Sequence, residues 1–260
     1  MSKMSTDPAS MIQEMDMAGI EKVVLLAFNA KRTLQVHVTN EYVSELVARY
    51  PNRFAGFASY DAHDGLIQKE LKQERERLGL VGYKLACGYL GLSPDDAGWD
   101  AVYLDAVENR LPVLLHMGYS PVKKVALRYC APQLLEKVLA KYPDLILVIA
   151  HMAWPWVDET ISLMNKYENV YADMSIVSYY QPIQTVIDIL QKAKKAKVAH
   201  KLIFGTDYPM CSFQEGAGRI REIRQQMNQS TNALTFHEWE MIFHGNARQV
   251  LRDTIPKKRM

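Results

Sequence analysis

The chain has 260 residues, of which 48% are hydrophobic, and its formal net charge is +2. This length and apolar content fit one large α/β domain over residues 1–260, and the charge points to neither nucleic acid nor an anionic membrane surface. No apolar stretch approaches the ~18 residues of a membrane span, and residues 1–10 lack the apolar core of a signal peptide. The three cysteines show no metal spacing and form no even set for disulfides. We therefore expect a cytoplasmic protein.

Helices and strands are predicted to alternate along the chain. Asp7 and Pro8 are typical of a helix start, and this first helix is expected to end near Met17, before Gly19. Apolar runs predict strands at 23–28, 54–60, 82–86, 112–116, 145–150, 170–174 and 201–205. Further helices are predicted at 40–50, 66–78, 99–109, 133–141, 157–166, 183–196, 216–228 and 237–252, the last with an irregularity at Asn246.

The order of these elements predicts the fold class. Strands recur about every 22–35 residues, the spacing of β-α-β units. Seven such units predict a TIM-type (β/α)8 barrel that lacks its first strand, because the chain opens on a helix with no apolar strand before it. The alternative is a doubly wound open sheet, but residues 29–31, which follow the first strand, are Asn-Ala-Lys rather than a glycine-rich phosphate turn.

Polar residues follow several of the predicted strands. The run Leu111–Gly118 (Leu-Pro-Val-Leu-Leu-His-Met-Gly) ends in His116, the strand at 145–150 is followed by His151, and the strand at 201–205 is followed by Asp207. Lys84 lies in the strand at 82–86. Because ligands bind at the carboxyl ends of parallel strands, we expect these side chains to form one site.

Several segments resemble the amidohydrolase-related family. They are Leu111–Gly118, Tyr142–Trp154, Asn169–Ser175 and Lys201–Pro209 (Lys-Leu-Ile-Phe-Gly-Thr-Asp-Tyr-Pro), and the resemblance extends over almost the whole chain from about Met11. This family contains metal-dependent hydrolases and decarboxylases with TIM barrels, including the aminocarboxymuconate semialdehyde decarboxylase group. The resemblance therefore implies an enzyme with a divalent metal, which we expect to be Zn²⁺, and a small-molecule substrate.

The resemblance also implies roles for single residues. His116 is expected to bind the metal, and Asp207 to bind it or to take a proton from metal-bound water. His151 is expected beside the metal, where it polarises water or substrate or acts as a further ligand. The alternatives are two structural histidines and an aspartate that only shapes a turn.

Other residues near the strand ends are candidates for substrate binding. Lys84 is either a partner for a substrate carboxylate or a surface-directed or ion-paired lysine. Tyr119 and Trp154 are candidates for holding a planar substrate. Asp173 is interpreted as either orienting a ligand or acting as a plain turn aspartate, and Cys87 as a packing residue.

One departure from the family is important. The first strand of the family ends in a His-x-His pair that supplies two metal ligands, and this chain has neither the strand nor the pair. The remaining ligands predict weak metal binding. The missing strand is also expected to expose the edges of its two neighbours unless a terminal segment or a second subunit, in a homodimer, covers them.

Three functions follow from the sequence. The first is a metal-dependent hydrolase that cleaves a small ester, lactone or amide bond with metal-activated water. The second is a metal-dependent decarboxylase of an aromatic or unsaturated carboxylic acid, and the third is a truncated barrel without catalytic activity.

Overall fold

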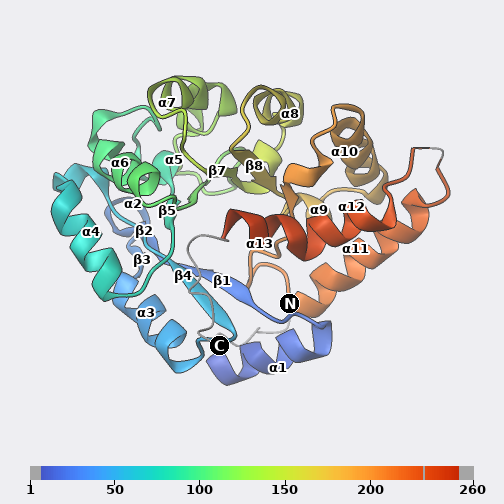
Figure 1. Ribbon diagram of the computed structural model, residues 1–260, viewed down its shortest axis with the longest axis horizontal. Coiled ribbons are helices and arrows are strands. Elements are labelled where there is room, and N and C mark those ends of the chain that lie inside the picture. The colour runs from blue at the N-terminus through green and yellow to red at the C-terminus, as the bar shows by residue number, and fades with distance from the viewer. Residues whose placement is uncertain (1–6, 231, 252–260) are drawn as a thin grey trace.

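Strands line the inside of the molecule and helices surround them (Figure 1). The structure, a computed structural model, describes residues 7–230 and 232–251. The parallel strands are β1 (Val23–Leu26), β4 (Phe54–Phe57), β5 (Tyr83–Leu85), β6 (Val113–Leu115), β7 (Leu147–Ile149), β8 (Val170–Asp173) and β9 (Leu202–Ile203). The main helices are α1 (Pro8–Ala18), α3 (Asn40–Arg49), α4 (Gln68–Arg77), α6 (Asp100–Glu108), α7 (Leu135–Lys141), α8 (Val157–Lys166), α10 (Ile183–Lys195), α11 (Phe213–Met227), α12 (Phe236–Glu240) and α13 (Asn246–Val250).

The strand order is that of a TIM barrel without one strand. β5 to β9 form a parallel sheet in chain order, and β1 pairs in parallel with β4. A bridge between Ala58 and Tyr83 joins the two sheets, so the full order is β1-β4-β5-β6-β7-β8-β9. The predicted fold class and all seven predicted strands are confirmed, although each strand is shorter than its apolar run.

Both faces of the central strands are covered, as their unbroken apolar runs predict. In β7, Leu147 and Ile149 pack into the large core beneath the helices, whereas Val148 packs with Tyr171 and Val250 in a second, smaller cluster. Side chains alternate between the two faces of a strand, so the position of a residue in its strand decides which of these two clusters it joins. The polar residues His116 and His151 follow the carboxyl ends of β6 and β7, and Asp173 is the last residue of β8.

The gap left by the missing strand lies between β9 and β1. On the β9 side, the Phe204 amide donates to the Ile242 carbonyl at 3.0 Å, and Asn246 Nδ2 donates to the Leu202 carbonyl at 2.7 Å. Ile242 lies in a π-helical turn, Met241–Gly245, that replaces the predicted continuous helix and confirms an irregularity beside Asn246. The C-terminal helical segment therefore satisfies the open edge of β9.

The edge of β1 behaves differently. Among residues 7–230 and 232–251, no strand other than β4 pairs with β1, and all four of its residues are half-buried. Arg248 of α13 reaches Glu21, just before β1, at 2.7 Å. A terminal segment thus covers the edge at β9, whereas the predicted exposure of the β1 edge stays a prediction.

Helix starts follow the capping rules where the cap is visible in the sequence. Asp7 accepts a hydrogen bond from the Ser10 amide, and α1 ends before Gly19 at φ 73°. Helix α11 begins at Phe213, three residues earlier than predicted, because Ser212 and Glu215 form a capping box. Residue 252, the last of the predicted C-terminal helix, lies outside the described residues.

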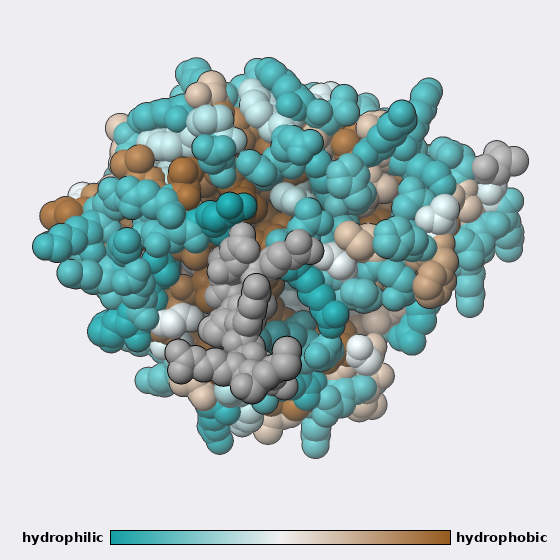
Figure 2. Space-filling view, in the orientation of Figure 1, coloured by the Kyte–Doolittle hydropathy of each residue, from teal (hydrophilic) through white to brown (hydrophobic). Residues whose placement is uncertain are grey.

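Short elements in the loops were not predicted. They are the hairpin of β2 (Phe28–Ala30) and β3 (Val36–Val38), with α2 (Lys31–Leu34) between them, and the short helices α5 (Cys87–Leu90) and α9 (Val177–Tyr180). Hydrophilic side chains cover most of the face seen in Figure 2, with hydrophobic residues between them in separate groups. None of the described helices has the length and apolar character needed to cross a membrane.

Candidate active site

The turns after β6 and β7 are packed tightly against each other. Gly118 has φ 88°, and a Cβ added there would lie 2.6 Å from the carbonyl carbon of Ala153. The Tyr119 amide donates to the Trp154 carbonyl at 2.6 Å. His151 and the next two residues all have positive φ values, a rare conformation that is costly outside glycine and is concentrated at functional sites.

This contact brings His116 and His151 together, as the sequence predicts. Their ring centroids are 5.1 Å apart, and the Tyr89 ring lies 4.9 Å from that of His116. His116 is buried, and its Nε2 atom has no hydrogen-bond partner among the described residues. Burial, together with the charge of Lys84 and the neighbouring His151, lowers the pKa of His116 well below its usual value, so the ring is neutral.

A short chain of hydrogen bonds sets the tautomer of His151. The Ser175 hydroxyl donates to the carboxylate of Asp173, which also accepts from the Ser175 amide at 2.8 Å. Because the hydroxyl proton is used there, Ser175 Oγ accepts from His151 Nδ1, 2.7 Å away. The Nε2 atom of His151 makes no hydrogen bond within the described residues. Asp173 thus positions His151 through Ser175, and its predicted role in orienting a ligand stays a prediction.

Lys84 extends from β5 and is 6% exposed. Within the described parts of the chain, its ammonium group makes no hydrogen bond or ion pair. Burial lowers its pKa, while the charges of Asp207 and Asp173 partly oppose this shift. A buried cation without a bonded partner is costly unless a ligand supplies the anion.

Asp207 lies on the turn after β9, where its φ is 53°. The turn is held by stacking of Tyr208 on Phe213, with ring centroids 4.6 Å apart. Asp207 itself is exposed, so its carboxylate is in contact with solvent while still acting on the pKa of Lys84. The sequence predicts its place at a strand end but not its exposure.

The two aromatic candidates differ in burial. Tyr119 is 58% exposed, whereas Trp154 is half-buried and packs against the main core. Their role in substrate binding stays a prediction. Cys87 is fully buried, and burial raises the pKa of its thiol, in agreement with a packing role.

Sequence reasoning missed Ser175 and Tyr89. Ser175 lies within the recognised segment Asn169–Ser175, but only the fold shows that its hydroxyl links Asp173 to His151. Tyr89 lies on α5, where its hydroxyl is 3.0 Å from Ser120 Oγ, and nothing in the residue spacing indicates its contact with His116.

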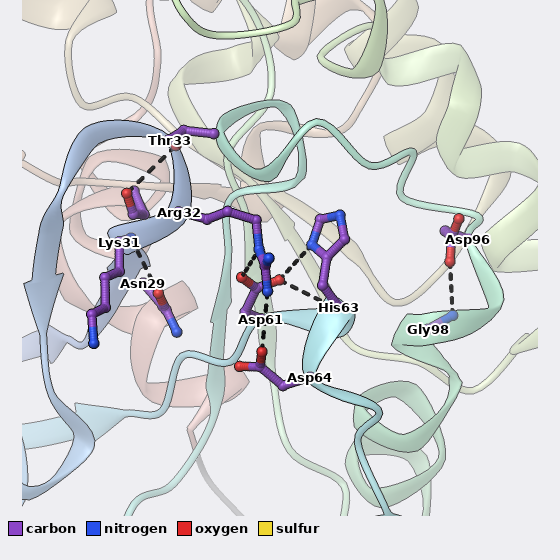
Figure 3. Close-up of polar contacts among 10 residues, drawn as sticks. Asn29, Lys31, Arg32, Thr33, Asp61, His63, Asp64, Asp96 and Gly98 are labelled. Atoms are coloured by element: carbon purple, nitrogen blue, oxygen red, sulfur yellow. Dashed lines mark hydrogen bonds and ion pairs between the residues drawn. The ribbon is translucent and has the colours of Figure 1, made fainter.

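A second polar cluster, shown in Figure 3, follows β4. Arg32, from the segment between β2 and β3, donates to buried Asp61 at 3.0 Å and to Asp64 at 3.2 Å, and His63 Nδ1 is 2.7 Å from Asp61. Burial alone raises the pKa of Asp61, but the hydrogen bonds from His63 and Arg32 outweigh burial and hold it below its usual value. These charges are satisfied internally, so the cluster fixes the hairpin beside the strand ends.

The described residues do not form a complete metal site. No group of three His, Cys, Asp or Glu side chains within residues 7–230 and 232–251 is placed to hold one metal ion. His116 Nε2 is a suitable ligand atom, and the hydrogen bond at His151 Nδ1 leaves Nε2 of that ring able to bind a metal, but Asp207 lies on an exposed turn. The set His116, His151 and Asp207 is therefore not preformed, and its role in metal binding stays a prediction.

The fold and the clustered polar side chains at its strand ends define a TIM-barrel protein of the kind that carries its site at the carboxyl ends of the strands. The family model described as amidohydrolase matches residues 9–252. The chain therefore belongs to the amidohydrolase family. No curated protein matches it.

Solved structures share this fold. An uncharacterised TIM-barrel protein from Bordetella bronchiseptica has 28% identity and a TM-score of 0.76, with 95% of this chain and 83% of that chain covered. A dihydroxybenzoic acid decarboxylase from Polaromonas, with bound manganese and the inhibitor 2-nitroresorcinol, has 20% identity, a TM-score of 0.68 and coverage of 95% and 86%. A probable 2-pyrone-4,6-dicarboxylic acid hydrolase from Acinetobacter baumannii has 19% identity, a TM-score of 0.66 and coverage of 94% and 88%.

Proposed function

We propose that this protein is a decarboxylase of a small aromatic or unsaturated carboxylic acid. The observation that carries the proposal is Lys84, a buried residue whose ammonium has no bonded partner in the described residues, near the buried and unpartnered Nε2 of His116. A substrate carboxylate would offset the desolvation of this cation. The decarboxylase among the solved structures supports the same choice of reaction.

The reaction needs one proton and releases carbon dioxide. Lys84 binds and orients the carboxylate by donating hydrogen bonds to it. A proton is added to the carbon that bears the carboxylate, the bond between that carbon and the carboxylate breaks, and its electron pair stays on the carbon skeleton as CO₂ leaves. The proton comes from solvent, and exposed Asp207 is proposed to relay it to the carbon.

A divalent metal, zinc or manganese, enters the proposal only through the family. Because the ligand set in the described residues is incomplete, no step above is routed through a metal. The metal content of the purified protein tests this part separately: less than about one-tenth of an equivalent agrees with weak binding, and a full equivalent contradicts it.

Hydrolysis is the second candidate. The observation that favours it is the Nε2 atom of His151, which makes no hydrogen bond within the described residues while Ser175 and Asp173 hold the ring through Nδ1. Such a nitrogen suits the removal of a proton from an attacking water molecule. A hydrolase would release acid from an ester or lactone without forming carbon dioxide.

The test is a panel of aromatic and unsaturated acids labelled with ¹³C in the carboxyl group, assayed for labelled CO₂ with and without added Mn²⁺ or Zn²⁺. We expect CO₂ from the wild type, and a loss of at least about 100-fold in Lys84→Met, since a charge-assisted hydrogen bond contributes about 1.5–3 kcal/mol and the binding orientation adds to it. Lys124→Met is the matched control, because the Lys124 ammonium is exposed and only contacts the Thr33 carbonyl.

Two results would contradict the proposal. Turnover of esters or lactones without labelled CO₂ would establish the hydrolase instead. Equal CO₂ release by wild type and Lys84→Met would show that Lys84 does not hold the substrate carboxylate.

A further inference from the structure

Ser175 follows β8, which lies between β7 and β9 in the sheet, and its hydroxyl faces the end of β7. The hydroxyl donates to Asp173 Oδ1, and its oxygen lies 2.7 Å from His151 Nδ1. The same Oδ1 atom accepts from the amide of Ser175 at 2.8 Å and from the amide of His151 at 3.2 Å. Ser175 is buried, which limits competition from water for these bonds. The ring and the backbone of His151 are therefore both held from the end of β8.

On the side of β9, Ser175 lies close to the backbone of Gly205, two residues before Asp207. β8 and β9 are paired in parallel up to Asp173. A Cβ atom added to Gly205 would lie 3.3 Å from Ser175 Cβ and 3.9 Å from Ser175 Oγ. The first of these distances is a tight contact, so a side chain at Gly205 would push on the residue that holds His151.

The next residue of this turn is fixed by helix α11. Thr206 is buried, and a Cβ atom added to Gly216 of α11 would lie 2.7 Å from Thr206 Cγ2. Asp207 follows with φ 53°, a conformation that needs support from its surroundings. The contacts of Gly205 with Ser175 and of Thr206 with α11 supply that support.

We propose that Ser175 is a shared positioning residue for the two groups that are proposed to handle a proton. It positions His151 through its hydroxyl and the Asp207 turn through its contact with Gly205. This inference rests on the proposed function for the reaction that the two groups serve, but not for their coupling in the folded protein. It predicts that a change at Gly205, after β9, alters the hydrogen bond of His151, after β7.

The test follows the imidazole of His151 by NMR in protein labelled with ¹⁵N histidine, with the signal assigned by its loss in His151→Gln. Because Ser175 Oγ accepts from Nδ1, this nitrogen carries a proton, and the buried bond slows its exchange with water. We expect Ser175→Ala to remove the protected signal. Gly205→Ala is expected to shift it and to speed its exchange about tenfold, because the added methyl group displaces the hydroxyl and weakens one hydrogen bond.

A second readout tests the coupling in the opposite direction. Ser175→Ala is expected to shift the backbone amide signals of Thr206 and Asp207, and this holds even where Gly205→Ala does not fold. CO₂ release from the acid in the panel that reacts fastest is expected to fall about tenfold in both variants, the loss of one hydrogen bond. Thermal melts check that each variant is folded.

Gly218→Ala is the matched control. Gly218 lies in α11, and a Cβ atom added there meets no heavy atom within 4 Å. The same chemical change is expected to leave both the His151 signal and CO₂ release as in the wild type.

The outcomes separate this inference from the proposed function. It is refuted, whether or not CO₂ is formed, by a wild-type His151 without a protected proton on Nδ1. A folded Gly205→Ala protein with an unchanged His151 signal, or unchanged amide signals in Ser175→Ala, refutes the coupling in the same way. If the NMR results are as expected but no acid loses CO₂, the positioning role stands and the decarboxylase is refuted. If the wild type and Ser175→Ala release CO₂ equally, the role of Ser175 in the reaction is refuted.

Discussion

Replacing Lys84 by methionine is expected to stabilise the protein while it removes carboxylate binding. Lys84 is 6% exposed and its ammonium makes no bond to the described residues, so only the nearby charges of Asp173 and Asp207 offset its desolvation on folding. Replacement of a buried charge by an apolar side chain of similar size is often stabilising by about 1–4 kcal/mol. Because those carboxylates lose a favourable charge, we expect the lower part of this range, about 1–2 kcal/mol.

The chain provides a matched control in Lys201, which is also buried. Its ammonium donates to the Met164 carbonyl at 2.7 Å and to the Tyr167 carbonyl at 2.8 Å. Lys201→Met leaves these two carbonyls without that donor and is expected to lower the free energy of unfolding by about 1–3 kcal/mol. The two substitutions are chemically identical and should have opposite signs.

The pH dependence of this effect follows from the lowered pKa of Lys84. Between the lowered pKa and the unfolded value near 10.4, the unfolded state binds more protons, so wild-type stability rises with pH in that window. Lys84→Met lacks this rise. Its advantage over the wild type is therefore full below the lowered pKa and shrinks as the pH increases through the window.

Urea unfolding followed by circular dichroism measures these differences, and thermal melts should shift by about 2–4 °C per kcal/mol. The reasoning is refuted if Lys84→Met destabilises the protein as much as Lys201→Met does. That result would show that the Lys84 ammonium already has a strong partner within the protein.

Three further predictions concern the framework of the site. Asp105→Ala is expected to lower the free energy of unfolding by about 3–5 kcal/mol in urea. In the wild type the buried Arg75 Nε donates to the Asp105 carboxylate at 2.8 Å, and the variant leaves this charge without that partner. A loss below about 1 kcal/mol would argue against a stabilising role of this ion pair. Gly118→Ala should both destabilise the protein and weaken benzoate binding in calorimetry, because the added methyl group meets the backbone of Ala153; unchanged binding would count against coupling of the two turns. Asn246→Ala should lower stability by about 1–3 kcal/mol by leaving an edge carbonyl of β9 unpaired, and hydrogen exchange of the Phe204 amide should accelerate, whereas unaltered exchange would contradict the sealing of this edge.

The strands could be predicted because burial on both faces leaves a clear mark in the sequence. Runs such as Val113–Leu115 contain no polar residue, and this pattern alone indicates a parallel sheet covered by helices. The predicted strands extend beyond the observed ones. The strand predicted at 54–60 passes the end of β4, because its apolar run continues into the buried loop that follows. The hairpin of β2 and β3 could not be found, because its second strand is three residues long and mostly exposed.

The candidate site was predicted in part. The closeness of His116 and His151 could be predicted, because they follow β6 and β7, which are neighbours in the sheet. The isolation of Lys84, the exposure of Asp207 and the hydrogen bond through Ser175 depend on loop conformations with positive φ values, which the residue types do not reveal. The covered edge of β9 likewise depends on a π-helical turn.

The most direct measurement is a crystal structure of the protein with bound benzoate or a hydroxybenzoate. We predict that a carboxylate oxygen of the ligand lies about 2.7–3.2 Å from Lys84 Nζ, at the carboxyl ends of β5 and β6. A ligand bound elsewhere, or a Lys84 ammonium bonded to a carboxylate of its own chain while the ligand is present, would contradict the account.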